Sequence, residues 1–140
     1  MIRKASAVWN GGLKDGKGIV STESGVLSNT PYAFVNRFEN EKGTNPEELI
    51  AAAHASCFSM ALSAQLGNAN LKPESIRTSA DLTMEKLDAG WTVTKIQLNV
   101  TAKVPDATPA AFQQAAEAAK AGCPISRLLN AKIEMTAVLA

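Results

Sequence analysis

Residues 45–67 read NPEELIAAAHASCFSMALSAQLG, and this stretch decides the fold. Asn45 is a preferred helix N-cap, Pro46 fits the first helical turn, and Glu48 stands where a capping box needs an acid. The residues that follow are apolar or small on almost every side, unlike the one-sided pattern of a surface helix. The stretch therefore predicts a long, central, buried helix that ends near Gly67.

Short strands are predicted on both sides of this helix. Before it, residues 6–9, 18–21 and 33–38 are apolar or mixed runs divided by turn residues, which is typical of an antiparallel meander. After it, residues 75–86 and 92–104 alternate between apolar and polar positions on either side of an Asp-Ala-Gly turn. That pattern predicts a long hairpin.

The C-terminal third predicts two more helices and one strand. Thr108-Pro109 repeats the cap-then-proline signal and opens an alanine-rich helix that ends at Gly122. Cys123-Pro124 then begins a short helix, and residues 133–139 have the composition of a closing strand. Grouped strands with a buried helix predict an α+β fold with antiparallel sheets.

Length and composition indicate a single domain covering residues 1–140. The chain has 46% hydrophobic residues and a formal net charge of +1, so neither nucleic acid nor an anionic membrane is an expected partner. No membrane-spanning segment is expected, because no apolar run approaches the roughly 20 residues that span a bilayer. The N-terminus does not resemble a signal peptide. We therefore expect a cytoplasmic protein that acts on a small molecule.

Two cysteines stand out. In a reducing cytosol, Cys57 and Cys123 are either buried thiols or a redox pair. A metal site is not expected, because His54 is the only other thiol or imidazole ligand and a closed zinc site needs four. Within an apolar helix, Cys57 has the ordinary role of a small hydrophobe. Cys123 lies between a helix-ending glycine and a helix-starting proline, where free N–H groups favour a thiolate, so local structure alone favours Cys123 as the reactive thiol.

Longer segments carry a family resemblance. The chain closely resembles the OsmC/Ohr family, in particular its osmotically inducible protein C (OsmC) branch, from about Trp9 to the C-terminus. The segments that carry the resemblance are residues 21–27 (STESGVL), 37–39 (RFE), 43–49 (GTNPEEL), 53–61 (AHASCFSMA) and 121–126 (AGCPIS).

The resemblance implies a thiol peroxidase that works as an intertwined homodimer in defence against oxidative and osmotic stress. Such enzymes reduce organic hydroperoxides, and hydrogen peroxide more weakly. Cys57 matches the attacking cysteine and Cys123 the resolving cysteine, so a Cys57 sulfenic acid would condense to a Cys57–Cys123 disulfide. A dithiol, such as dihydrolipoamide or a lipoylated protein, would reopen that bond. The resemblance implies no cofactor.

A thiol in an apolar helix needs a cation to stabilise its thiolate. The family pattern supplies Arg37, held by Glu47, although Glu47 also suits the helix dipole. Ten residues of helix separate Glu47 from Cys57 by about 15 Å, so the partner subunit is expected to supply the pair. His54, three residues before Cys57, could form a Cys/His dyad or be structural, and Arg127 is expected on the surface.

Two other functions fit the same sequence. A thiol redox sensor or disulfide carrier would use both cysteines without significant peroxide turnover. A noncatalytic dimeric domain or small-molecule binder would instead hold inert, buried thiols.

The apolar neighbours Phe58, Met60 and Leu62 predict a pocket around Cys57 that accepts an organic tail, so alkyl hydroperoxides are expected to be better substrates than hydrogen peroxide.

Overall fold

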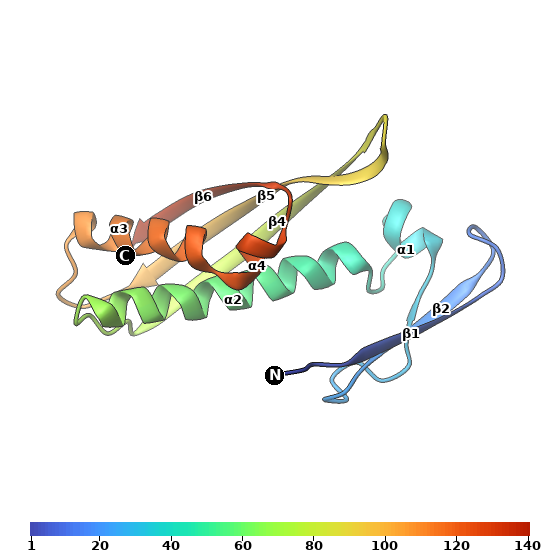
Figure 1. Cartoon of the computed structure of the whole chain (residues 1–140), viewed down its shortest axis with the longest axis horizontal. Coiled ribbons are helices and arrows are strands. Elements are labelled where there is room, and N and C mark those ends of the chain that lie inside the picture. The colour runs from blue at the N-terminus through green and yellow to red at the C-terminus, as the bar shows by residue number, and fades with distance from the viewer. The chain divides into compact units, whose positions relative to one another are not determined.

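The computed structural model describes all 140 residues, and the chain forms two compact units, Met1–Leu49 and Ile50–Ala140 (Figure 1). The predicted α+β class is confirmed, with one three-stranded sheet in each unit. That residues 1–140 behave as a single domain stays a prediction.

The first unit contains the predicted meander. Strands β1 (Ala5–Asn10), β2 (Lys17–Thr22) and β3 (Thr30–Tyr32) pair in sequence order, and both pairings are antiparallel. Trp9 and Tyr32 pack over Gly18 in the middle of this sheet, where a Cβ atom would lie 2.5 Å from the Tyr32 ring. Glycine is therefore required at this position of β2.

The strand predicted over residues 33–38 is wrong. Helix α1 (Phe34–Phe38) occupies most of it, and the third strand lies just before. The reason is the spacing of the aromatic residues, since Phe34 and Phe38 are four apart and their ring centroids lie 4.7 Å from each other on one helix face. Extended Ala33 begins this helix.

Helix α2 (Pro46–Asn68) begins at the end of the first unit and runs through the second. The second unit adds strands β4 (Ser75–Leu87) and β5 (Gly90–Lys103), helices α3 (Pro109–Gly122) and α4 (Pro124–Leu128), and strand β6 (Lys132–Leu139). The β4–β5 hairpin is confirmed. The prediction of purely antiparallel sheets misses one pairing, because β6 runs parallel to β5 after α3 and α4 carry the chain back across the sheet.

Two predicted helix starts are confirmed at atomic detail. The backbone N–H of Glu48 donates to Asn45 Oδ1 at 2.8 Å, and that of Ala111 donates to Thr108 Oγ1 at 3.1 Å. Each bond satisfies one of the N–H groups that a helix leaves free at its first turn. The local sequence therefore fixes where α2 and α3 begin.

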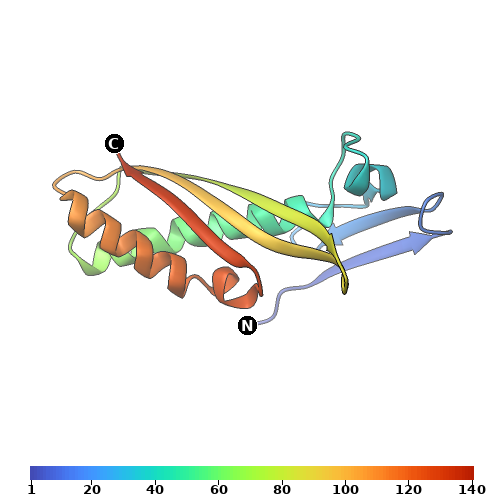
Figure 2. The ribbon, with the colours of Figure 1, turned by 90° about the horizontal axis from the view of Figure 1, so that it is seen from above.

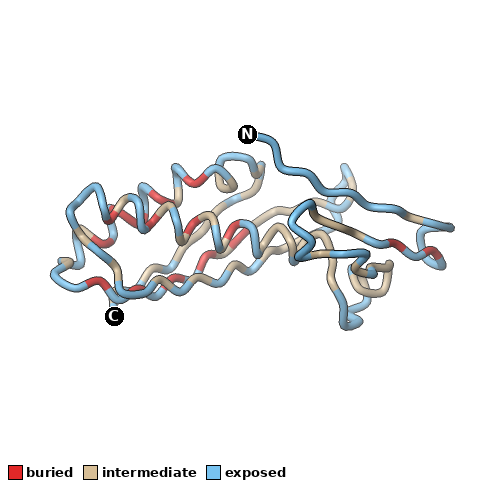
Figure 3. The backbone as a smooth tube through the Cα atoms, turned by 90° about the horizontal axis from the view of Figure 1, so that it is seen from below, coloured by how far each residue is buried: buried red, intermediate tan, exposed pale blue.

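The core of the second unit lies between the sheet and helices α2 and α3, which cover the same sheet face (Figures 1 and 2). Along β5, alternate side chains from Ile96 to Ala102 are buried and the residues between them are not. Figure 3 shows the buried positions on these elements, whereas only Gly16 and Gly18 are buried in residues 1–49. The second unit therefore holds nearly all of the chain's own core.

Helix α2 buries one stripe rather than its whole surface, so the prediction of an all-round buried helix is wrong for the isolated chain. The stripe has the four-residue spacing of a helix face: His54, Phe58, Leu62 and Leu66. Met60, on another face, is 77% exposed. The expectation that no stretch is long and apolar enough to cross a bilayer is also wrong, because α2 meets that test by length and composition. One stripe of this helix packs against the sheet of the second unit.

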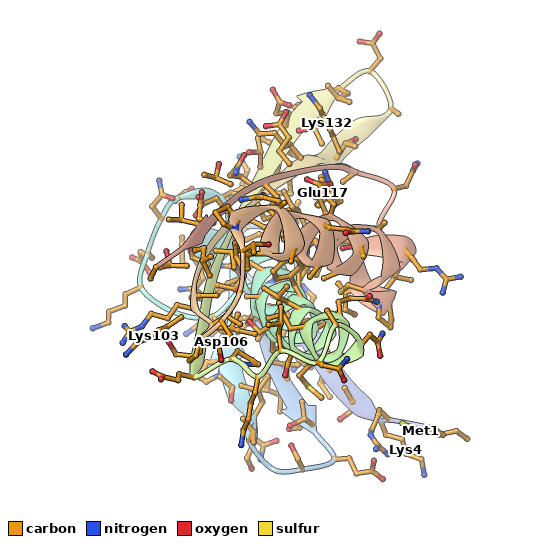
Figure 4. The ribbon with its side chains drawn as sticks, turned by 90° about the vertical axis from the view of Figure 1, so that its left-hand side faces the viewer. Met1, Lys4, Lys103, Asp106, Glu117 and Lys132 are labelled. Atoms are coloured by element: carbon orange, nitrogen blue, oxygen red, sulfur yellow. The ribbon has the colours of Figure 1, made fainter.

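Charged side chains of the second unit form ion pairs on the surface. Lys103 pairs with Glu74, Glu117 with Lys120, and Lys132 with Glu134. Figure 4 labels Lys103, Glu117 and Lys132 among the projecting side chains. Because exposed pairs of this kind contribute little to stability, the apolar core holds the unit together.

Candidate active site

The two cysteines meet in the second unit. Cys57 lies at the middle of α2 and Cys123 between α3 and α4, and the Cys123 thiol donates to Cys57 Sγ at a distance of 2.8 Å. Both are free thiols, with Cys123 buried and Cys57 partly exposed. Sulfurs in a disulfide lie about 2.05 Å apart, so a small side-chain rotation would bring these two into bonding range.

The backbone around Cys123 explains how this contact arises. The N–H of Cys123 donates to the Ala119 carbonyl and closes α3, and Pro124 then starts α4 in a new direction. Because proline has no N–H, the first free donor of α4 is that of Ile125. That N–H lies close enough to the Cys57 sulfur to act on the pKa of its thiol. The helix break therefore presents both a thiol and a backbone donor to Cys57.

The environment of Cys57 acts on its ionisation in two directions. Burial raises the pKa of the Cys57 thiol above its ordinary value, and the adjacent Cys123 sulfur raises it further. The Ile125 N–H lowers it, because a donor stabilises the thiolate. The raising causes dominate, so within this chain alone Cys57 is a thiol at neutral pH.

A hydrogen bond from His54 of α2 to α4 joins the same two segments as the cysteine contact. His54 Nε2 lies 2.7 Å from Ser126 Oγ, and the residue is completely buried. Burial lowers the pKa of His54. The imidazole pairs with Ser126 and not with Cys57, so the structure does not support the Cys/His dyad that the sequence left open.

Arg37 and Glu47 meet in the first unit. Arg37 Nε and Nη2 both donate to Glu47 Oε1, at 2.9 and 2.7 Å. The Arg37 guanidinium also lies 5.2 Å from the centre of the Phe38 ring. The Glu47 side chain is 14% exposed and that of Arg37 is 40% exposed, so the carboxylate holds a cation that still reaches solvent. A second contact, from Asn45 Nδ2 to the Asn36 carbonyl, ties the same two segments together.

The sequence-predicted residues thus form two pairs, Cys57 with Cys123 and Arg37 with Glu47. The backbone N–H of Glu48 donates to the side chain of Asn45, the N-cap of α2. Arg127 is exposed, as expected. Ser126 was not predicted. The sequence does contain a spacing that indicates its role. His54 lies three residues before Cys57 and Ser126 lies three residues after Cys123, so a contact between the two cysteines brings His54 and Ser126 near each other.

One prediction about the surroundings of Cys57 is wrong. Phe58 and Leu62 are completely buried in the core and line no open pocket. Their four-residue spacing places them on the face of α2 that packs against the sheet. An apolar hollow is found instead in the first unit beside Arg37, with a volume of about 270 Å³. No group of three or more His, Cys, Asp or Glu side chains is placed to hold a metal ion.

Solved structures show the same fold. An OsmC-like protein from Mycoplasma pneumoniae superposes with a TM-score of 0.78, covering 100% of this chain and 98% of that chain at 13% identity. The organic hydroperoxide resistance protein OhrB of Bacillus subtilis superposes with a TM-score of 0.69, covering 98% of both chains at 24% identity. At these identities the likeness concerns the fold alone.

Sequence comparison adds the family. The chain is 55% identical to peroxiredoxin OsmC of Escherichia coli over 95% of this chain and 93% of that protein. It is 28% identical to OhrB of Bacillus subtilis over 84% of this chain and 85% of that protein. The sequence profile of the OsmC-like proteins matches residues 39–138, which include both cysteines and Glu47. The chain therefore belongs to the OsmC-like protein family.

Proposed function

We infer that this protein is a peroxidase that reduces organic hydroperoxides at the expense of a thiol reductant, and we propose that Cys57 and Cys123 carry the reaction. The observation that supports the assignment best is the 2.8 Å contact between the two sulfurs. An inert core thiol needs no partner sulfur, whereas a two-cysteine peroxidase needs one within reach.

The proposed cycle has three steps. The Cys57 thiolate attacks the terminal oxygen of the hydroperoxide, so that an S–O bond forms, the O–O bond breaks and an alcohol leaves with a proton. The Cys123 sulfur then attacks the Cys57 sulfenic acid, forming the disulfide and releasing water. An external dithiol reduces that disulfide by two exchange steps and is itself left as a disulfide.

The first step requires a thiolate, although burial raises the pKa of Cys57. We assign the compensating cation to Arg37, which Glu47 holds by two hydrogen bonds. On a regular helix the ten residues from Glu47 to Cys57 rise about 15 Å, so we assign the Arg37–Glu47 pair to the cysteine of the partner subunit in a homodimer. Dimerisation would then be needed for full activity.

The exposed apolar surface supports the homodimer. Large apolar side chains of the first unit are 37–85% exposed in the single chain: Val8, Leu13, Ile19 and Val26. Met60 of α2 is exposed as well, at 77%. Val8 and Ile19 are cross-strand neighbours on β1 and β2, and exposed apolar side chains that adjoin one another mark a surface that a partner can cover. A second copy of this chain is the partner that the family suggests.

The hollow beside Arg37 supports an organic substrate. Its walls are mostly apolar or aromatic: Trp9, Leu13, Tyr32, Ala33, Phe34, Phe38 and Pro46. Ligand pockets combine such walls with a few polar groups, and here the polar group is the Arg37 guanidinium. We propose that the walls take the alkyl tail while the guanidinium faces the peroxide oxygens. Alkyl hydroperoxides should then exceed hydrogen peroxide in kcat/KM.

The proposed reductant is a dithiol of the dihydrolipoamide type, free or attached to a lipoylated protein, because two neighbouring thiols complete both exchange steps without releasing a mixed disulfide. We place this cycle in the cytoplasm, as part of the defence against oxidative and osmotic stress.

Replacing the attacking sulfur tests the proposal. Cys57→Ser should abolish consumption of an alkyl hydroperoxide in the presence of dihydrolipoamide, because a hydroxyl is a poor substitute for a thiolate. Ser56→Ala is the matched control, because the Ser56 hydroxyl bonds only to carbonyls of its own helix. Circular dichroism should show that both variants fold. Retained turnover in a folded Cys57→Ser variant would remove Cys57 from the mechanism.

A further inference from the structure

The His54–Ser126 hydrogen bond joins the same two segments as the cysteine pair. His54 stands three residues before Cys57 on α2, and Ser126 stands three residues after Cys123, in α4. The 2.7 Å bond therefore lies about one helical turn from the sulfur contact on both sides. Apart from contacts to the Cys57 sulfur itself, it is the only hydrogen bond between α2 and residues 123–128.

The buried ring of His54 has one defined orientation of its proton. Nδ1 is buried and has no hydrogen-bond partner. A buried N–H without an acceptor is rarer and more costly than a buried lone pair without a donor. The proton therefore resides on Nε2, and His54 donates to Ser126 Oγ. Because burial lowers the pKa of His54, the ring stays neutral in this arrangement.

The sulfur contact cannot hold α4 in place throughout the proposed cycle. Once Cys57 carries an oxygen, the direct hydrogen bond from the Cys123 thiol to a bare Cys57 sulfur is lost. Apolar contacts of Ile125 and Leu129 with the core remain, but these are not directional. The bond from His54 to Ser126 is the one hydrogen bond between α2 and the turn that carries Cys123 that does not involve the Cys57 sulfur, so it is unaffected when that sulfur is oxidised.

We propose that the His54–Ser126 hydrogen bond is a clamp that keeps Cys123 against Cys57 while Cys57 is a sulfenic acid. The inference rests on the proposed function, and it makes both side chains positioning residues. In the step they assist, the Cys123 sulfur bonds to the Cys57 sulfur, the S–O bond breaks, and water leaves with the Cys123 proton. In the competing step, a second hydroperoxide transfers an oxygen to the sulfenic acid, giving a sulfinic acid and an alcohol.

The clamp should determine how much of the Cys57 sulfenic acid forms the disulfide and how much is overoxidised to the sulfinic acid. Disulfide formation is intramolecular, and its rate depends on how well the two sulfurs are held together. Overoxidation instead rises in proportion to peroxide concentration. Loosening the clamp should leave the first attack on peroxide unchanged and make Cys57 overoxidise at lower peroxide. A residue that served only global stability would not change this ratio in a folded protein.

Four variants separate the clamp from simple structural support. His54→Leu and Ser126→Ala each remove one partner, whereas His54→Gln keeps an N–H at a similar reach. The double variant His54→Leu/Ser126→Ala removes both polar groups, so that neither is left unpaired, and its stability should recover toward that of the parent. Ser126→Ala is a small change at a half-buried position, so it should fold even where the histidine variants do not.

The experiment exposes the reduced protein to increasing concentrations of an alkyl hydroperoxide and determines disulfide and sulfinic acid by mass spectrometry. A sulfenic-acid probe gives the rate of the first step in parallel. Ser126→Ala and His54→Leu should reach half-overoxidation at about fivefold lower peroxide, the factor expected for one ordinary hydrogen bond. The first step should be unchanged, and His54→Gln should behave like the parent. The double variant should remain sensitive although its thermal stability recovers.

Two results would overturn the clamp. One is an unchanged ratio of disulfide to sulfinic acid in folded Ser126→Ala. The other is a double variant whose resistance returns together with its stability, because the bond would then serve the fold alone. A parent protein that forms neither sulfenic acid nor disulfide would overturn the proposed function, and the clamp with it.

Discussion

Two inactive variants, mixed, should restore activity if the proposed site is shared between subunits. Cys57→Ser removes the attacking sulfur, and Arg37→Ala removes the cation that Glu47 holds at 2.7 Å. In a heterodimer, the Arg37→Ala subunit supplies an intact cysteine and the Cys57→Ser subunit supplies an intact arginine to it. One of the two sites is then complete, whereas each mutant homodimer has none.

The expected magnitude follows from the helix spacing and from dimer symmetry. About 15 Å of helix separate Glu47 from Cys57, so the pair is assigned to the opposite subunit. Random assortment of equal amounts gives about half heterodimers, each with one of its two sites complete. The mixture should therefore recover about a quarter of the wild-type activity.

The assay is consumption of an alkyl hydroperoxide with a dithiol after the two variants are unfolded and refolded together. Native mass spectrometry measures the heterodimer fraction. The matched control mixes Cys57→Ser with the double variant Cys57→Ser/Arg37→Ala, which contains no attacking cysteine and should stay inactive. If heterodimers form and no activity returns, Arg37 does not act across the interface.

Three further variants test separate parts of the account. Cys123→Ser should stop after one oxidation and accumulate sulfenic and then sulfinic acid on the Cys57 peptide, as seen by mass spectrometry; a peptide without added oxygen would contradict the resolving role. Arg37→Ala should shift the pH profile of Cys57 alkylation to higher pH, because burial raises the pKa of this thiol and the variant lacks the compensating cation; an unchanged profile would exclude Arg37. Leu62→Ala should lower the free energy of unfolding by about 2–5 kcal/mol in urea titrations at fixed protein concentration, because Leu62 is completely buried; a loss below about 1 kcal/mol would contradict its place in the core.

Local signals in the sequence predicted the helix starts correctly. Asn45 and Thr108 each have a side-chain oxygen that accepts an N–H from the first helical turn, and this chemistry needs no tertiary contact. The β4–β5 hairpin was predictable for a similar reason, since alternation along β5 continues through its buried residues.

Features that depend on tertiary contacts could not be predicted in this way. Residues 33–38 satisfy a strand pattern and a helix pattern alike, and the stacking of Phe34 on Phe38 marks the helix that forms. The composition of α2 does not tell which of its faces packs against the sheet, so the sequence predicts a pocket position for Phe58, whose side chain is completely buried in the core. The parallel pairing of β6 likewise depends on where the two preceding helices lead the chain.

The candidate site was predictable to different degrees. Family resemblance named Cys57, Cys123, Arg37 and Glu47, and the structure brings them together as two pairs. Helix-dipole reasoning alone favoured Cys123 as the reactive thiol, because the sequence shows where free N–H groups lie but not which sulfur they meet. In the structure the Ile125 N–H reaches Cys57.

The most direct test of the central claim is a titration of the reduced protein with one equivalent of an alkyl hydroperoxide in the absence of any other thiol. We expect each chain to lose both free thiols and two hydrogens of mass, and digestion to yield a single cross-linked peptide joining Cys57 to Cys123. Peroxide consumption that leaves both thiols titratable, or that places the oxidation on other residues, would contradict it.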